Sequence, residues 1–273
     1  MLVASALALV PPLSLALALS PVASSRRPTA FPNSVPIQRD DLNVIVRQTG
    51  QTAPAAAAIG VPAHCACRHD FAQAFAMDPL PLGTSRANSG LLKLTCPHLV
   101  RAVDVLEDEG VMSRLNAALK ASAELRDAAM GAHAVHADAR RDILRDPRDL
   151  IAVRSKLGER GAEAFLSAGV AGSSEKTAAI DVKCLHAWLA DRLFRGQGES
   201  PLGDSVEREL RNRGVKIGGT EACRLLCDPG SDMMPLPPKP RNRQRLRTGK
   251  ETARRKRRKY REKSDVGSGP ELC

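Results

Sequence analysis

Aromatic side chains are scarce in this sequence: only seven of its 273 residues are Phe, Trp or Tyr, and Trp188 is the single tryptophan. The core must therefore rest on Leu, Val and Ala, which favours helices over an aromatic-rich β fold. Cysteine is sparse as well, with seven residues. A chain of this length can bury its own apolar core, so the low cysteine count excludes a small scaffold built on disulfides.

Net positive charge is absent from the body of the chain, although the net charge of the whole chain is +11. Between Lys239 and Lys263 there are 14 Lys or Arg and two Glu, a local charge of +12, which leaves −1 for the remainder. A folded domain this close to neutral is not a basic nucleic-acid binder. We expect the Lys239–Lys263 segment to contact RNA or another anionic surface without sequence specificity. The same segment also matches a nuclear-import patch.

The first 23 residues carry no charged side chain, and Leu13–Leu19 is an apolar run. Pro11 and Pro12 interrupt a continuous helix, so a cleaved signal is favoured over a membrane span. We therefore expect no transmembrane helix in the mature chain. Residues 24–39 combine Ser and Arg without acidic residues, as organelle transit segments do. Thr29–Pro32 resembles the junction of two-part plastid leaders. We predict that residues 1–39 direct the protein to a plastid. The alternative destinations are the secretory pathway and, if the leader is inactive, the nucleus.

Two short segments are prone to form strands, Leu42–Val46 and Leu91–Thr95. Pro97 suits the first position of a following helix, which Gly110 is expected to end. Ser113 is predicted to cap an alanine-rich helix that continues towards Leu144 before Pro147 interrupts it. The stretch from His64 to His69 should form a loop or turn.

The C-terminal half of the body is predicted to be helical. The expected elements are a helix at Leu150–Ala168, a loop at Gly169–Ser174, a strong helix at Ile180–Phe194, a short helix at Ser205–Arg213 and one turn at Cys223–Cys227. We therefore expect an α+β fold that is predominantly helical, with a small β element packed on four to five helices. It spans residues 41–230, and a disordered basic tail occupies residues 235–273.

Several short motifs occur in order along the body of the chain. They are Arg47–Gly50, Cys65–Cys67, Leu94–Pro97, Leu106–Glu107, Ala132–His133, Gly169–Gly172, Val182–Ala187 and Ser200–Gly203. Together they resemble a mainly bacterial family known as domain of unknown function 501, over about Asp41 to Cys227. The family's Gly-Thr-Pro-Phe-Pro-Thr stretch is reduced here to Gly83-Thr84, and His136 replaces an aromatic residue. The resemblance implies no activity, because the family has none assigned.

Cysteine and histidine could form a metal site. Zinc is bound by four N or S ligands in a tetrahedron, often from Cys-x2–4-Cys pairs, and Cys223-x3-Cys227 has that spacing. In a helix, Cys184 and His186 would lie about 200° apart and could not share one ion unless the helix starts later. The zinc hypothesis therefore names Cys65, Cys67 and Cys96 with either Cys184 or His186. Buried thiols and disulfides stay open as alternatives.

A catalytic alternative uses the region around Cys184. Cys184 would be the nucleophile and His186 or His133 the base. Backbone N–H groups of Gly169, Gly172 and Ser173 could hold an anion, although such loops often only turn the chain.

His133 and His136 lie one helical turn apart, with Arg140 one turn further, so they could ligate a metal or an anion. The alternative is a pair of half-buried helix-surface histidines. Taken together, the sequence favours an uncharacterised noncatalytic binding module, metal-stabilised in one hypothesis, with a polyanion-binding tail. The competing hypothesis is a hydrolase or transferase acting on an anionic substrate.

Overall fold

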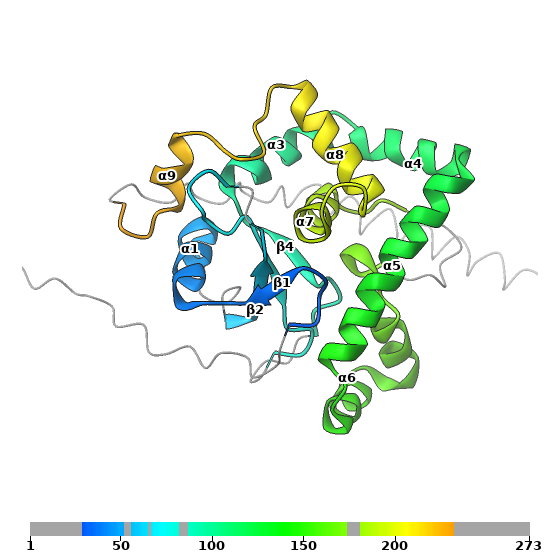
Figure 1. Cartoon of the computed structure of the whole chain (residues 1–273). Coiled ribbons are helices and arrows are strands. Elements are labelled where there is room, and N and C mark those ends of the chain that lie inside the picture. The colour runs from blue at the N-terminus through cyan, green and yellow to red at the C-terminus, as the bar shows by residue number, and fades with distance from the viewer. Residues whose placement is uncertain (1–28, 52–55, 65–66, 82–86, 174–180, 232–273) are drawn as a thin grey trace, which may run out of the picture. The chain divides into compact units, whose positions relative to one another are not determined.

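A computed structural model describes residues 29–51, 56–64, 67–81, 87–173 and 181–231 (Figure 1). Most of the predicted leader, Cys65, Gly83-Thr84, Ser174 and the Lys239–Lys263 tail lie outside these ranges. Within them, no helix has both the length and the apolar character that crossing a bilayer requires.

A small antiparallel sheet forms the centre of the N-terminal third. Its strands are β1 (Ser34–Pro36), β2 (Ala58–Pro62), β3 (Ala74–Met77) and β4 (Leu92–Leu94), in the order β1-β2-β3-β4. Ser34 is opposite Pro62, and Ala74 is opposite Leu94. The predicted strand at Leu91–Thr95 is thus confirmed as β4.

The other predicted strand, Leu42–Val46, is wrong: it lies within the helix α1 (Arg39–Thr49). Leu42, Ile45 and Val46 are spaced i, i+3 and i+4, so on a helix they share one face. The Gln38 N–H donates to the Asp41 carboxylate over 2.9 Å at the helix start, and left-handed Gly50 ends the helix. The β-branched residues are thus compatible with a helix whose two ends are well capped.

Seven further α-helices follow among the described residues. They are α3 (Pro97–Asp108), α4 (Val111–Ala121), α5 (Ala123–Ile143), α6 (Pro147–Leu166), α7 (Leu185–Arg195), α8 (Pro201–Asn212) and α9 (Ala222–Cys227). Pro97 is the first residue of α3 as predicted, and Gly110, two residues after the last residue of α3, adopts a left-handed conformation. The fold class is confirmed: α+β and predominantly helical.

The alanine-rich region does not form the single predicted helix. Gly110, not Ser113, precedes the first residue of α4, so Ser113 lies inside that helix. The capping serine is Ser122, whose Oγ accepts from the N–H of Leu125 at the start of α5. Either serine could cap a helix in isolation, but α4 already begins after the left-handed Gly110, so Ser113 does not lie at a helix start.

The helix α7 begins at Leu185, later than the predicted Ile180, and residues 181–184 are not helical. The side-chain amide of Asn116 in α4 pairs with the backbone of Val182: its Oδ1 accepts from the N–H over 2.7 Å and its Nδ2 donates to the C=O over 3.3 Å. This pairing occupies the backbone groups of Val182 outside any helix. The start of α7 is therefore decided by a contact with a segment 66 residues away.

The sheet lies between α1 and α7 (Figure 1). One apolar cluster joins Ile45 of α1 to Phe75 of β3, and both side chains are fully buried. The larger cluster joins β4 to α3, α5, α7 and α8 around Trp188 and Leu189. A third cluster, which includes Val153 and Phe165, packs α6 beneath the C-terminal end of α5. The core thus rests mainly on aliphatic side chains, as the composition predicts.

Candidate functional site

The helix α3 contributes to two separate groups of reactive side chains. Cys96 directly precedes its first turn and Glu107 lies in its last turn. Eleven residues of helix span about 16 Å. One metal ion cannot contact side chains at both ends of α3, so two clusters must be considered separately.

The first cluster surrounds His186 in the first turn of α7. Nδ1 of His186 lies 3.9 Å from Sγ of Cys184 and 3.3 Å from Oε1 of Glu107. Nε2, on the other side of the ring, lies 3.6 Å from Oδ1 of Asp104. Because Cys184 is extended (φ −159°) and α7 starts only after it, Cys184 and His186 do share one site. The late helix start therefore removes the geometric objection to that pair.

Electrostatic contacts favour a charged imidazole at this cluster. Burial lowers the pKa of His186, but the hydrogen bonds with Cys184 and Glu107 have the larger combined effect. They raise the pKa above its usual value, to about 10. Burial raises the pKa of Glu107, while the hydrogen bonds from His186 and from the Leu185 N–H lower it below its usual value. The resting site is thus an imidazolium beside a carboxylate that also caps α7.

Two kinds of chemistry fit this half-buried cluster. Cys184 Sγ, His186 Nδ1 and a Glu107 carboxylate oxygen all lie within 4.8 Å of one another, so they could hold a transition metal with one open position. Alternatively, Cys184 could act as a nucleophile with His186 as acid–base and Asp104 orienting the ring. The first use requires His186 to lose its proton, and the second uses that proton.

The second cluster consists of buried cysteines: Cys67, Cys96, Cys223 and Cys227, each at most 5% exposed. The interaction with Cys223 lowers the pKa of Cys96, but that with Cys227 and burial raise it, to about 12. Of the predicted metal ligands, the structure places Cys184 and His186 with Glu107, whereas among the described residues neither Cys67 nor Cys96 belongs to a group of three ligand atoms this close together. Cys65 lies outside the described residues, and the metal assignment stays a prediction.

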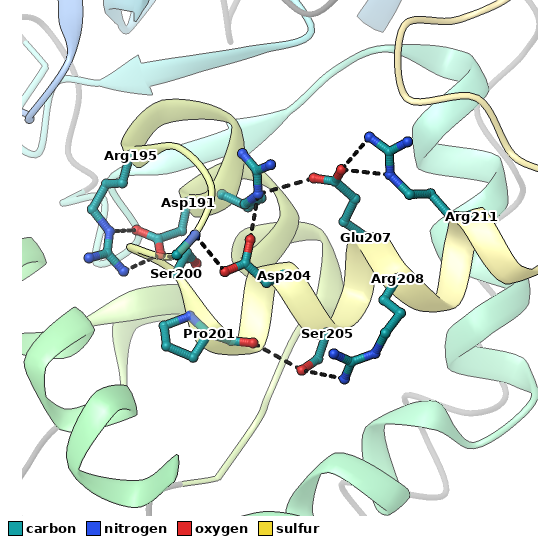
Figure 2. Close-up of polar contacts among 11 residues, drawn as sticks. Asp191, Arg195, Ser200, Pro201, Asp204, Ser205, Glu207, Arg208 and Arg211 are labelled. Atoms are coloured by element: carbon teal, nitrogen blue, oxygen red, sulfur yellow. Dashed lines mark hydrogen bonds and ion pairs between the residues drawn. The ribbon is translucent and has the colours of Figure 1, made fainter. Parts of the chain in front are cut away.

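A third group of polar residues is buried between α5, α7 and the start of α8. Oδ1 of Asp191 accepts from His136 Nε2 over 2.8 Å and from Arg195 Nε over 2.9 Å. Oδ2 accepts from Arg195 over 2.8 Å and from the hydroxyl of Ser200 (Figure 2). Burial raises the pKa of Asp191, but the hydrogen bonds from His136 and Arg195 lower it to about 2. Asp191 therefore carries a buried negative charge that three partners stabilise.

Sequence patterns did not single out this group, although the signals were present. Asp191 and Arg195 are an i,i+4 pair of opposite charge on α7, and Ser200 belongs to the Ser200–Gly203 motif. A Cβ at Gly203 would lie 2.4 Å from the Trp188 carbonyl oxygen, so only glycine allows α8 to approach α7 this closely. The motif is thus explained by helix packing.

The Gly169–Gly172 loop, which forms the 3₁₀ turn η1 (Val170–Gly172), uses its donors within the protein. The Val170 N–H donates to Nδ1 of His133 over 2.9 Å. The N–H groups of Gly169, Gly172 and Ser173 donate to loop carbonyls. These four N–H groups are therefore not available to the anion that the catalytic hypothesis places here.

His133, the second candidate base, is buried against the Trp188 ring, with the ring centroids 5.4 Å apart. Burial, followed by the charges of His136 and Lys183, lowers its pKa to about 4 although Asp191 opposes the shift. Arg140, one helical turn beyond His136, is fully buried and donates to the backbone carbonyls of Ala168 and Ser89. These contacts show how His133 and Arg140 fix the loop region.

A family model described as "Protein of unknown function (DUF501)" matches residues 63–208, more than half of the chain. The matched range contains the His186 cluster, the Asp191 group, Cys67 and Cys96, and it ends before α9. Neither the curated proteins nor the solved structures contain a match.

Proposed function

Because the chain belongs to the DUF501 family of proteins of unknown function, we propose a function from its own residues: it is a noncatalytic binding module with a metal-stabilised fold and a basic tail that binds polyanions. The observation that carries the proposal is the separation of charge, with +12 between Lys239 and Lys263 and −1 elsewhere. Such a tail neutralises phosphates without reading bases.

The polar groups of the folded domain support the noncatalytic part of this proposal. Asp191 is saturated by His136, Arg195 and Ser200, and the Gly169–Gly172 loop donates to its own carbonyls and to His133. These contacts stabilise the fold and leave neither Asp191 nor these loop N–H groups free to bind a substrate. The ligand atoms of Glu107, Cys184 and His186, which lie within 4.8 Å of one another, support the metal-stabilised part.

Polyanion binding is tested with fluorescent single-stranded RNA and with vesicles that contain an anionic lipid. We expect the full chain to bind both. For RNA that engages six cations, the logarithm of the association constant should fall with a slope of about −4 against the logarithm of salt concentration. A chain shortened after Leu236 should lose this binding. Replacing Arg254–Lys259 by six Gln is the matched control, since it keeps the length and removes only charge. Full RNA binding by the shortened chain at physiological salt would refute the proposal.

A second candidate function is supported by one specific contact, the 3.9 Å separation of Cys184 Sγ and His186 Nδ1. In that alternative the chain is a hydrolase or transferase acting on an anionic ester. The Cys184 sulfur attacks the acyl or phosphoryl centre, the bond to the leaving oxygen breaks, and His186 gives that oxygen a proton. Turnover of aryl acyl and phosphate esters is compared between wild type and Cys184→Ala. Equal rates would remove Cys184 as the nucleophile.

We further propose that residues 1–39 direct the protein to a plastid, because this segment is apolar at first and then Arg- and Ser-bearing without acidic residues. The first forty residues fused to a fluorescent protein should accumulate in that organelle. Accumulation in the secretory pathway, or a diffuse cytosolic signal, would count against it.

A further inference from the structure

We propose that Glu107, Cys184 and His186 bind a zinc ion that joins the C-terminal end of α3 to the start of α7 and keeps one coordination position open to solvent. This inference rests on the proposed function, because it names the ion and the ligands of the metal-stabilised part. It does not involve the polyanion-binding tail. It departs from the ligand set expected from the sequence, because Glu107 takes the place of the other three cysteines.

The ligand atoms are spaced as a tetrahedral zinc ion requires. Nδ1 of His186 lies 3.3 Å from Oε1 of Glu107 and 3.9 Å from Sγ of Cys184. All three ligand atoms lie within 4.8 Å of one another. Zinc bonds of the usual lengths at tetrahedral angles place N and O about 3.3 Å apart and N and S about 3.6 Å apart. Both distances from the imidazole are thus within a few tenths of an ångström of the values for a bound ion.

The other side of the His186 ring is held by hydrogen-bond acceptors. Nε2 lies 3.2 Å from the backbone carbonyl oxygen of Val100 and 3.6 Å from Oδ1 of Asp104. A carbonyl and a carboxylate can only accept, so a neutral ring carries its proton on Nε2 and directs the Nδ1 lone pair towards the other two ligands. Metal-binding histidines almost always donate their second N–H to such groups. The surroundings of Nε2 therefore match the outer shell of a zinc site.

Glu107 is oriented by a contact of its own. Its Oε1 accepts a hydrogen bond from the Leu185 N–H over 2.9 Å. Carboxylates that bind metals are themselves usually hydrogen-bonded, and a carboxylate has further lone pairs that remain for the ion. The contact that caps α7 thus also positions a ligand.

Cys184 is positioned by the non-helical segment before α7. Its backbone is extended, with φ −159° and ψ 115°, and its Sγ lies beside the His186 ring. Two hydrogen bonds from the Asn116 side chain, of 2.7 and 3.3 Å, hold Val182 two residues earlier. The helix α3, which supplies Glu107, packs against α7 (Figure 1). These contacts fix the three ligands before any metal binds, which reduces the entropy lost on coordination.

The donor atoms select the metal and its coordination. Zinc accepts thiolate sulfur, imidazole nitrogen and carboxylate oxygen, whereas magnesium and calcium take oxygen ligands. Zinc sites with three protein ligands keep the fourth position for water or another small molecule. The side chains of His186 and Glu107 are 21% and 28% exposed, so solvent reaches them. We therefore expect a solvent molecule as the fourth ligand.

Zinc binding releases protons and competes with the catalytic alternative. The charged imidazole of His186 belongs to the metal-free chain. Zinc takes the place of its Nδ1 proton and of the Cys184 thiol proton, and both protons pass to solvent. The ion then occupies the sulfur and nitrogen lone pairs that a nucleophile and a base need. A zinc-bound Cys184 is thus not free to attack an ester.

The test dialyses the metal-free full chain against zinc and measures bound metal by mass spectrometry. We expect about one zinc per chain. Cobalt in place of zinc should give intense tetrahedral bands that shift when azide enters the open position. Cys184→Ser and Glu107→Gln should each weaken zinc binding at least tenfold. Cys227→Ser and Glu109→Gln are the matched controls and should bind zinc as the wild type does, because Cys227 lies on α9 and Glu109 pairs with Arg213.

Since a ligand variant can fail to fold, a second measurement uses the wild-type chain. Alkylation of Cys184 by iodoacetamide is followed by mass spectrometry of its peptide. One equivalent of zinc should slow this reaction at least tenfold, and a chelator should restore the rate. Equal alkylation rates with and without zinc would overturn the proposal.

The outcomes separate this inference from the proposed function. Zinc bound in full by both Cys184→Ser and Glu107→Gln would overturn the site but leave a metal-stabilised fold in place. A wild-type chain that binds no zinc would overturn both. RNA binding by the tail is measured separately, so that part of the proposed function can fail or hold without this site.

Discussion

Nε2 of His136 donates a hydrogen bond over 2.8 Å to Oδ1 of Asp191, joining α5 to α7 deep in the core. Both side chains are at most 1% exposed. The carboxylate can only accept, so the imidazole proton lies on Nε2. Arg195 and Ser200 complete the coordination of the same carboxylate. The charge on Asp191 therefore organises the packing of three segments.

Removing the negative charge of Asp191 is predicted to lower the unfolding free energy of the protein substantially. Asp191→Asn keeps the shape of the side chain but leaves Arg195 buried without a counter-ion. Breaking a buried pair in this way costs about 3–5 kcal/mol of unfolding free energy. Denaturant unfolding followed by circular dichroism measures the loss. Asp138→Asn is the control: Asp138 pairs with Arg141 on the surface, where a change below about 1 kcal/mol is expected. Equal losses in the two variants would contradict the role of Asp191.

His133 is predicted to make stability depend on pH. Its pKa in the folded protein is about 4, below the ordinary value of 6.5, so the unfolded chain takes up the proton first. The stabilising contribution is complete above pH 6.5 and is lost as the pH falls towards 4. At pH 4 the loss amounts to about 3 kcal/mol.

The matched variant for this prediction is His133→Asn, whose Oδ1 can still accept from the Val170 N–H while the side chain no longer titrates. Unfolding free energies of the two proteins are measured from pH 7.5 to pH 4. The wild type should lose stability more steeply than the variant between pH 6.5 and 4. Parallel profiles would show that His133 does not carry the effect.

Two glycines are predicted to respond in opposite directions to substitution by alanine. A Cβ at Gly169 would lie 2.3 Å from Nδ1 of His133, so Gly169→Ala should destabilise the protein by about 1–3 kcal/mol or more. At Gly131, within α5, an added methyl group would have no neighbouring atom within 4 Å, so Gly131→Ala should stabilise by up to about 1 kcal/mol. Thermal unfolding of both variants provides the comparison. A stabilised Gly169→Ala protein would contradict the described packing of the loop.

Glu107 is predicted to keep His186 protonated. Glu107→Gln retains an oxygen that can accept from the Leu185 N–H but removes the negative charge, so the pKa of His186 should fall from about 10. Titration of the imidazole resonances by NMR measures the change. Glu109→Gln removes a charge two residues along, where the side chain pairs with Arg213, and should leave the His186 titration in place. If both variants shift it equally, the specific contact with Glu107 is not the cause.

Local sequence rules predicted the elements whose ends are chemically marked. Pro97 begins α3, left-handed Gly110 follows it, and Leu92–Leu94 forms a strand. The strand predicted at Leu42–Val46 is wrong because β-branched residues tolerate both structures, and the capping residues Gln38 and Gly50 decide for a helix. The motifs that resemble DUF501 were sufficient to identify the family over residues 63–208.

The candidate sites depended on contacts between distant segments. The sequence brought Cys184 and His186 to attention, but only the position of Glu107 and the late start of α7 placed them in one cluster. Asp191 gave no local signal that it would meet His136, 55 residues away.

The sequence by itself thus determined the composition of the core, the family, the separation of charge and most helices, because each depends on neighbouring residues or on simple sums. The tertiary structure alone decided which side chains meet: His136 with Asp191, and His186 with Glu107. Such pairings result from how whole elements pack, and packing depends on all the buried surfaces at once rather than on any single segment.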